Sequence, residues 1–346
     1  MRIVDLRSDT LTLPTDEMLD AIKKAKLGDD TWREDPTVNR LEEIAANKMG
    51  KEAALLVTSG TQGNLTSILT HTRHGDEVIM EADAHTYHWE VAGISRLGGL
   101  QSRLVKGEYG VMDIEDVEAA IRSKPVDIHQ PPTTLICMEN THNHSGGAVL
   151  RPEDMKPIYD LAKSENIAVH TDGARVFNAS VALDIDVREL TKYTDSIMFC
   201  LSKGLSCPVG SIIAGESEFI EKARKIRKML GGGMRQAGII AAPGIIALEK
   251  MIDRLRDDHE NAKFLAQGLS QIEGIKVDVN RVQTNLVMFD VGGLGVDSSE
   301  FVGRLTKEGI KALSFGGNKV RVATYRGIEK NDLEYALDVM KRLFVQ

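Results

Sequence analysis

The chain has 346 residues, of which 42% are hydrophobic and 27% are charged, a composition typical of a folded, water-soluble protein. At roughly 100–200 residues per domain, this length predicts two domains with cores large enough to fold without disulfides. The net charge of −8 argues against a nucleic-acid partner, because contacts to phosphates need a basic face.

The N-terminal segment does not resemble a signal peptide, since charges appear within its first residues and no apolar stretch follows. No run approaches the roughly 18 uninterrupted apolar residues that a membrane span needs. We therefore expect a cytoplasmic protein with no membrane partner. Cys137, Cys200 and Cys207 lack the spacing of a disulfide framework, and the first two lie in apolar runs. These two are expected to be small buried side chains.

Short apolar runs alternate with amphipathic segments, which is the pattern of a sheet covered by helices. A polar arm at 1–13 precedes a helix predicted over 14–25. A second helix is predicted between Asp35, which can cap it, and Gly50, which can end it. Strands are then expected at 53–57, 77–81, 135–139, 167–171, 196–201 and 211–214.

Polar clusters follow most of these strands at their carboxyl ends, which is where ligands bind in parallel sheets. From Gln236 a helical stretch is predicted to Glu273, with a break near Asp253. A smaller α/β domain should follow it. Its strands are expected at 276–279, 285–291 and 319–324, and its helices at 299–307 and 330–344.

The sequence SGTQGN at 59–64 lies between a predicted strand and a predicted helix. Its glycines allow the backbone to approach an anion, and a helix N-terminus offers unpaired N–H groups there. A plain turn is the alternative interpretation. The motif is neither a P-loop nor a dinucleotide-binding turn.

Two further residues follow apolar strands. Asp172 ends one of them, where a carboxylate can keep a pyridine nitrogen protonated and make the ring an electron sink; a helix cap is the alternative. Lys203 follows the next strand, 31 residues later (203 − 172), and its amine can attack an aldehyde. An anion site, a pyridine partner and an amine together fit one cofactor, pyridoxal 5′-phosphate (PLP).

The sequence resembles the threonine aldolases of the aspartate aminotransferase superfamily, which are fold type I PLP enzymes. The motifs that carry the resemblance cover nearly the whole chain: DLRSDT at 5–10, GDD and EDP within 28–36, KEAALLVTSGTQGN at 51–64, MENTHN at 138–143, HTDGARVFNAS at 170–180, CLSKGLSCPVGS at 200–211 and RKMLGGGMRQAG at 227–238. The resemblance implies an α/β fold. A large PLP-binding domain at 1–250, with a mixed, mostly parallel seven-stranded sheet, would precede a smaller α/β domain at 251–346.

The resemblance also implies how PLP is held. Lys203 would carry the cofactor as a Schiff base, and Asp172 would bind its ring nitrogen. Gly60 and Thr61 would bind the phosphate through backbone N–H groups and a hydroxyl. His85 would stack on the ring near the substrate hydroxyl, which makes it the first candidate base, although a lone histidine is more often structural.

The substrate carboxylate would be fixed by Ser8, Arg175 and Arg321, because an arginine fork binds a carboxylate bidentately. Arg175 would also contact the cofactor. For Arg321, which lies in the predicted strand KVRVAT, an arginine at the strand edge that pairs with solvent or a carboxylate is the alternative.

Other positions are weaker candidates. His129 is the second candidate base, and Lys228 and Arg235 are candidates for contacts to the phosphate or to another subunit. A flexible glycine loop at 231–233 is the alternative for the last two. The family commonly has Tyr-Gly where this chain has Trp32 and Arg33, so the substrate preference or the subunit contact is expected to differ there.

The implied reaction is the retro-aldol cleavage of L-threonine, L-allo-threonine and other L-3-hydroxy amino acids to glycine and an aldehyde such as acetaldehyde. The implied assembly is a homo-oligomer, at least a dimer and by resemblance a tetramer. Transamination, β-elimination or racemisation on the same scaffold stays open as an alternative. A regulatory aminotransferase-like domain is disfavoured, because the chain leaves no room for an effector module. No metal site is expected, since His142 and His144 fit a polar loop better than a ligand set.

Overall fold

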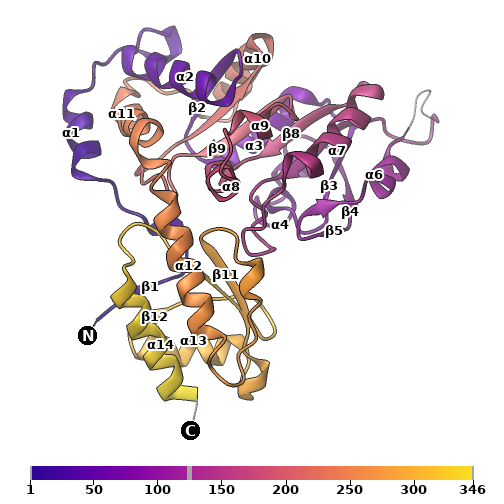
Figure 1. Ribbon diagram of the computed structural model, residues 1–346. Coiled ribbons are helices and arrows are strands. Elements are labelled where there is room, and N and C mark those ends of the chain that lie inside the picture. The colour runs from indigo at the N-terminus through magenta and orange to yellow at the C-terminus, as the bar shows by residue number, and fades with distance from the viewer. Residues whose placement is uncertain (1, 123–126, 345–346) are drawn as a thin grey trace.

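The computed structural model describes residues 2–122 and 127–344, so the outermost ends of the two expected domains lie outside the described residues. Figure 1 shows a large unit built on a sheet and a small unit beside it, with both chain ends at the small unit. The domain division near residue 250 stays a prediction.

The large unit is organised around one seven-stranded sheet. The strand order is β2 (Ala53–Val57), β10 (Ser211–Gly215), β9 (Ser196–Cys200), β8 (Ala168–Asp172), β7 (Thr133–Glu139), β3 (Glu77–Glu81) and β4 (Gln101–Val105). Strand β10 runs antiparallel to both neighbours, whereas the other pairs are parallel. The predicted mixed, mostly parallel sheet is confirmed; β4 was not predicted.

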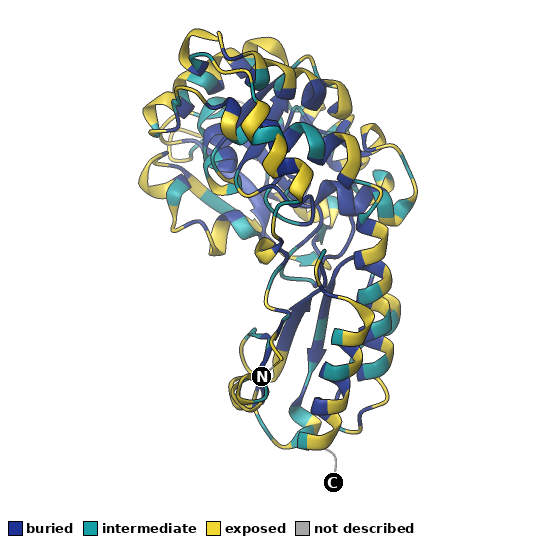
Figure 2. Cartoon of the chain, turned by 90° about the vertical axis from the view of Figure 1, so that its left-hand side faces the viewer, coloured by how far each residue is buried: buried dark blue, intermediate teal, exposed yellow. Residues whose placement is uncertain are grey.

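Helices cover both faces of this sheet, so its strands are apolar on both sides, as expected of buried parallel strands. In β2, Leu55 and Val57 pack toward α10 (Ser217–Met229), while Ala54 and Leu56 join the main core on the opposite face. Figure 2 shows the buried strands enclosed by helices that expose only their outer sides.

The second predicted helix is confirmed as α2 (Pro36–Met49). The Asp35 side chain accepts hydrogen bonds from the Thr37 and Val38 N–H groups, both at 3.0 Å, and so satisfies N–H groups that the helix leaves free. Gly50 ends the helix with a φ of 61°, a conformation that suits glycine.

The other helical predictions also hold. The first helix is α1 (Asp16–Lys24). The long helical stretch is divided, as predicted, into α11 (Gly238–Ile246), a π-helical turn (Ala247–Met251) and α12 (Leu255–Leu269). The remaining elements of the large unit are α3 (Gly60–His71), α4 (His85–His88), α5 (Gly93–Arg96), β5 (Gly107–Glu108), β6 (Val111–Met112), α6 (Ile114–Ala120), α7 (Pro152–Ser164), α8 (Val176–Leu183) and α9 (Arg188–Thr191).

The small unit is an antiparallel sheet packed against helices around its own core. Its strands are β11 (Leu286–Asp290), β14 (Lys319–Ala323) and β13 (Leu313–Ser314), and its helices include α12, α13 (Ser298–Lys307) and α14 (Lys330–Phe344). The strand predicted at 276–279 is wrong. Lys276 forms only an isolated bridge with Asp290, and Val279 begins a short 3-10 turn.

The N-terminal arm joins the two units. Its strand β1 (Val4–Asp5) pairs in parallel with β12 (Ile310–Lys311), and Val4 and Leu6 lie in the core of the small unit. All three cysteines are buried and free. The predicted burial of Cys137 and Cys200 is therefore confirmed. Among the described helices, none combines the length and the apolar character needed to cross a membrane.

Candidate active site

A cavity of about 330 Å³ lies between the two units, beyond the carboxyl ends of β3, β8 and β9. It is lined by Ser8, Thr10, His85, Trp89, Asn143, Arg175, Lys203, Leu313, Phe315 and Arg321. Five of these are residues that the sequence selected: Ser8, His85, Arg175, Lys203 and Arg321. The structure therefore brings together side chains that are far apart along the chain, at the edge of the sheet where a ligand site was expected.

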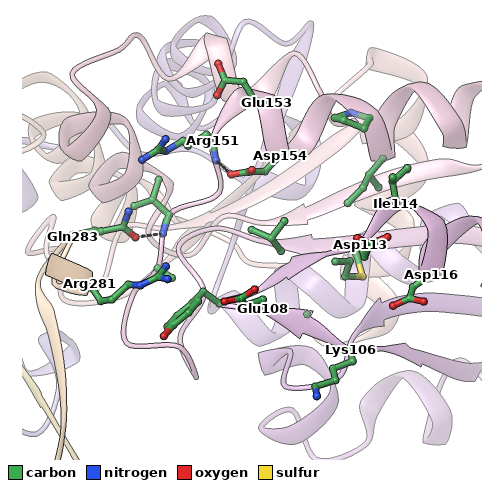
Figure 3. A pocket seen from close by; sticks show the side chains of 18 residues that line it. Lys106, Glu108, Asp113, Ile114, Asp116, Arg151, Glu153, Asp154, Arg281 and Gln283 are labelled. Atoms are coloured by element: carbon green, nitrogen blue, oxygen red, sulfur yellow. Dashed lines mark hydrogen bonds between the residues drawn. The ribbon is translucent and has the colours of Figure 1, made fainter. Parts of the chain in front are cut away.

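A larger cavity of about 740 Å³ lies beside the β5–β6 hairpin and contains none of these residues (Figure 3). Its walls mix acids and bases, including Glu108 and Arg151, and two residues from the small unit reach into it. Gln283 accepts a hydrogen bond from the Val149 N–H at 2.9 Å, and Arg281 lies 3.8 Å from the centre of the Tyr109 ring. Size alone therefore does not identify the site.

Asp172 is a buried carboxylate that accepts hydrogen bonds only from neutral donors. Its Oδ2 accepts from Asn64 Nδ2 at 2.8 Å and its Oδ1 from the Ala174 N–H at 3.0 Å. Among the described residues it forms no ion pair, although it is only 4% exposed. A buried carboxylate needs a compensating charge, and a protonated ring nitrogen would supply one, so the side chain fits PLP.

The Asn64 amide is held in a fixed direction behind Asp172. Its Oδ1 lies 3.2 Å from Nε2 of His170, whose Nδ1 lies 2.8 Å from the Ser196 hydroxyl. Burial lowers the pKa of His170 to about 3, so the ring is neutral and donates from one nitrogen only. Since carboxylates only accept, Asn64 must donate to Asp172 and accept from His170.

The predicted anion site lies at the start of α3, the helix that follows β2 along the chain. The Ser59 side chain caps the helix by accepting from the Gln62 N–H at 3.2 Å, which leaves the N–H groups of Gly60 and Thr61 in the unpaired first turn. A Cβ on Gly60 would lie 3.0 Å from the Cys200 sulfur, so a side chain here would force its neighbours to shift. These features fit a phosphate group.

The 228–235 segment reaches the same helix start from α10. A Cβ on Gly232 would lie 2.3 Å from the Gln62 amide nitrogen, so this glycine turn packs directly on α3. Lys228 and Arg235 are both exposed, and Nη1 of Arg235 bonds Asp29 Oδ2 at 3.1 Å. Within one chain, neither Lys228 nor Arg235 lines the cavity.

Arg175 already holds a carboxylate. Its Nε and Nη2 donate to Oδ2 and Oδ1 of Asp9, both at 2.7 Å, and both residues are buried. Burial acts to raise the pKa of Asp9, but the charge and hydrogen bonds of Arg175 hold it well below its usual range. Asn285 from the small unit adds a third donor at 3.1 Å. The bidentate fork predicted for the substrate is thus used by Asp9.

Arg321 is a buried cation that no carboxylate contacts among the described residues. Its Nη1 donates to Asn143 Oδ1 at 2.7 Å, its Nε has no partner, and among the described residues it forms no ion pair. Burial and the nearby charge of Arg175 lower the pKa of Arg321 to about 10. A buried, unpaired guanidinium in a cavity is a receptor for an anion.

His85 begins α4 and faces the cavity with its side chain 31% exposed. Its backbone N–H donates to Glu139 Oε2 at 2.6 Å, and its ring Nδ1 lies 2.9 Å from Glu90 Oε1. Glu90 could not be selected from the sequence, because a glutamate five residues after a histidine belongs to no motif. Asn143 lay inside the motif MENTHN but received no role.

His129 is not brought to the site within one chain. It lies on the loop before β7, at the end of the sheet opposite the cavity, with its side chain 81% exposed and 2.6 Å from Asp127. Arg33 also lies outside the cavity. It adopts a φ of 60°, a backbone conformation that favours glycine, and it pairs with Glu221 on α10 at 2.5 Å. The neighbouring Trp32 is 73% exposed.

The strand order, with a lysine after β9 and an aspartate ending β8, defines the class as fold type I, the fold of PLP-dependent enzymes. A solved structure described as Leishmania major threonine aldolase shares this fold. Its TM-score is 0.84 at 17% identity, with 99% of each chain covered.

Comparison with known sequences gives the family. Residues 5–292 match the family described as Beta-eliminating lyase. The chain is 45% identical to low-specificity L-threonine aldolase 1 of Arabidopsis thaliana over 99% of this chain and 96% of that one. It is 44% identical to the low specificity L-threonine aldolase of Escherichia coli strain K12, over 84% and 85%. The chain belongs to the beta-eliminating lyase family and, within it, to the low-specificity threonine aldolases.

Proposed function

We propose that this protein is a PLP-dependent lyase that cleaves L-threonine, L-allo-threonine and related L-3-hydroxy amino acids to glycine and an aldehyde. The observation that carries the proposal is the convergence of Lys203, His85 and the unpaired Arg321 on one cavity, with Asp172 close behind it. The matches to threonine aldolases along nearly the whole chain support the choice of reaction.

The site residues fit the cofactor in three places. Lys203 would hold PLP covalently, Asp172 would keep its ring nitrogen protonated, and Gly60 and Thr61 would bind its phosphate. When bound, PLP accepts the electron pair released by cleavage of a bond at the substrate Cα. The side chains then decide which bond is cleaved, because they fix how the substrate lies.

Substrate binding would start from Arg321, whose free Nε and charge suit the substrate carboxylate, with Ser8 as an additional donor. This anchor on the small unit would orient the amino acid across the cavity toward His85. His85 would then take the proton from the β-hydroxyl, a step typically worth about 10²–10⁴ in rate. Trp89 and Phe315, with ring centroids 6.2 Å apart, would shield the reacting carbon from water.

The test is Lys203→Ala. We expect it to abolish both the visible absorbance of the bound cofactor and the release of acetaldehyde from threonine. Assays for keto acids, ammonia release and loss of optical activity on the same enzyme would separate cleavage from transamination, β-elimination and racemisation. Retention of absorbance and turnover by Lys203→Ala would refute the assignment, and exclusive formation of a keto acid would favour transamination.

We also infer that the protein acts as a homo-oligomer, at least a dimer and by family a tetramer. Large apolar side chains are exposed along the N-terminal arm, the loop at 25–35, α10 and α11, namely Leu11, Leu13, Leu27, Trp32, Met229 and Ile239. Exposed apolar side chains that form a contiguous patch typically mark a contact surface. His129 would reach an active site only from another copy. Light scattering during gel filtration would test this, and a monomer of about 38 kDa that remains active would contradict it.

A cytoplasmic location completes the proposal. It is supported by the three free, buried cysteines, which are typical of a reducing compartment. Cell fractionation would test it, and recovery with a secreted or membrane fraction would contradict it.

A further inference from the structure

We propose that Glu90 is a positioning residue that keeps a proton on Nδ1 of His85 and so reserves Nε2 of that ring for the substrate's hydroxyl proton. This inference rests on the proposed function, because it assigns a task to the candidate base. Glu90 itself lies behind His85 and is not among the residues that line the cavity.

The contact between the two side chains is direct. Glu90 Oε1 lies 2.9 Å from His85 Nδ1, and Glu90 is 5% exposed, so water does not compete for this carboxylate. A carboxylate that faces one ring nitrogen fixes the N–H there and leaves the other nitrogen as the acceptor. In the part of the chain that the structure describes, Nε2 of His85 has no hydrogen-bond partner.

A second contact fixes Glu90 in turn. The Asn64 amide nitrogen donates to Glu90 Oε1 and to Asp172 Oδ2, both at 2.8 Å. Its two N–H groups are therefore shared between two carboxylates, while its oxygen accepts from His170 on the opposite side. The Asn64 amide thus connects Glu90, behind the proposed base, to Asp172, which would bind the cofactor ring nitrogen.

The acidic groups around His85 favour the protonated form of its ring. Burial acts to lower the pKa of His85, but the hydrogen bond that its ring donates to Glu90 and the charges of Asp172, Glu90 and Glu139 outweigh it and raise the pKa. Burial and the charge of Asp172 also raise the pKa of Glu90 itself. The two side chains therefore hold a proton between them more firmly than either would alone.

The same cavity contains cations as well. Lys203, Arg175 and Arg321 line it together with His85 and oppose protonation of the ring. Glu90 is the acidic group that contacts the ring directly, which makes it the group whose removal should matter most. An opposite charge within about 4–6 Å typically shifts a pKa by about 1–3 units.

The experiment compares Glu90→Gln with the wild type on the full-length protein, both free and loaded with PLP. Deuterium exchange at histidine carbon C2, followed by mass spectrometry, reports the pKa of each ring and needs no turnover. Glu77→Gln is the matched control, since Glu77 is fully buried but bonds Arg122 at the far end of β3.

We expect Glu90→Gln to lower the pKa of His85 by about one unit or more, because glutamine retains the shape and loses the charge. The acid limb of the kcat profile should move to lower pH by the same amount, and kcat should fall by about 10–100-fold while KM changes little. Glu77→Gln should leave the His85 titration unchanged. Glu90→Asp keeps the charge, so its His85 pKa should lie between those of the wild type and Glu90→Gln. If Glu90→Gln folds poorly, Glu90→Asp takes its place in the comparison.

An unchanged His85 titration in Glu90→Gln, or an equal shift in Glu77→Gln, would overturn the proposal. The result can be distinguished from failure of the proposed function. If the wild type releases no aldehyde but the titration shifts, the Glu90–His85 pair stands and the reaction is wrong. If aldehyde is released and the titration does not shift, only the role of Glu90 fails.

Discussion

Arg321→Gln removes a buried positive charge that forms no ion pair among the described residues. In most proteins the loss of a buried arginine lowers stability, because the arginine is paired. Here the free energy of unfolding should rise, because the folded chain currently bears the cost of burying an uncompensated charge. The same substitution should damage catalysis, since that charge is what receives the substrate carboxylate.

The structure sets the size of both effects. Burial lowers the pKa of Arg321 to about 10, and at about 1.4 kcal/mol per unit the shift from its ordinary value corresponds to a cost of roughly 3 kcal/mol in the free protein. Burying the glutamine amide still costs some free energy, so we expect the free energy of unfolding to rise by about 1–2 kcal/mol. Two charge-assisted hydrogen bonds at about 1.5–3 kcal/mol each would be lost from the bound substrate. The value of kcat/KM for threonine should therefore fall by about 10²–10⁴-fold.

Arg175→Gln is the matched control, because it removes a buried arginine that is paired. It would leave Asp9 as an uncompensated buried carboxylate, which costs about 3–5 kcal/mol. Urea unfolding of the PLP-free variants and steady-state kinetics of the loaded enzymes would measure both quantities. If Arg321→Gln loses as much stability as Arg175→Gln, or if its kcat/KM is unchanged, then the reasoning about an unpaired anion receptor is wrong.

Two further predictions concern the arm and the exposed apolar surface. Asp9→Asn should lower stability at pH 7 and flatten the loss of stability on acidification. The lowered pKa of Asp9 contributes stability above its unfolded value of 3.8 that is lost as the pH falls through the folded value; parallel acid unfolding curves for wild type and variant would contradict this. Trp32→Ser should change the unfolding free energy of the chain by less than about 0.5 kcal/mol. It should raise the oligomer dissociation constant by about 30-fold or more, as for a buried interface tryptophan; sedimentation that is unchanged on dilution would count against it.

Much of the fold could be predicted because local signals and burial agree. The strand at 53–57 and the helix from Asp35 to Gly50 combine an apolar pattern with clear ends, and both match the structure closely. Strand β4 was missed because it lies at the edge of the sheet and most of its side chains are exposed or half-buried. An edge strand lacks the continuous apolar run by which its neighbours were recognised.

The site could be predicted only where a residue follows a strand or lies within a motif. Lys203, Asp172 and His85 satisfy that condition, and the structure brings all three to one place. Glu90 and Phe315 do not, because their positions depend on how separate loops and units pack together. The pairing of Arg175 with Asp9 was not foreseen for the same reason, since the two residues are 166 positions apart.

The Asp9 contacts explain why the arm belongs to the site although it supplies none of the residues proposed for proton transfer. Asp9 accepts from Arg175 in the large unit and from Asn285 in the small unit, and β1 of the same arm pairs with the small unit. One buried carboxylate thus joins the two halves at the place where the cavity lies between them. Because Arg321 lies on the small unit and Lys203 on the large one, the distance between the carboxylate receptor and the cofactor lysine depends on this junction. The arm therefore sets the geometry of the site by holding the two units together.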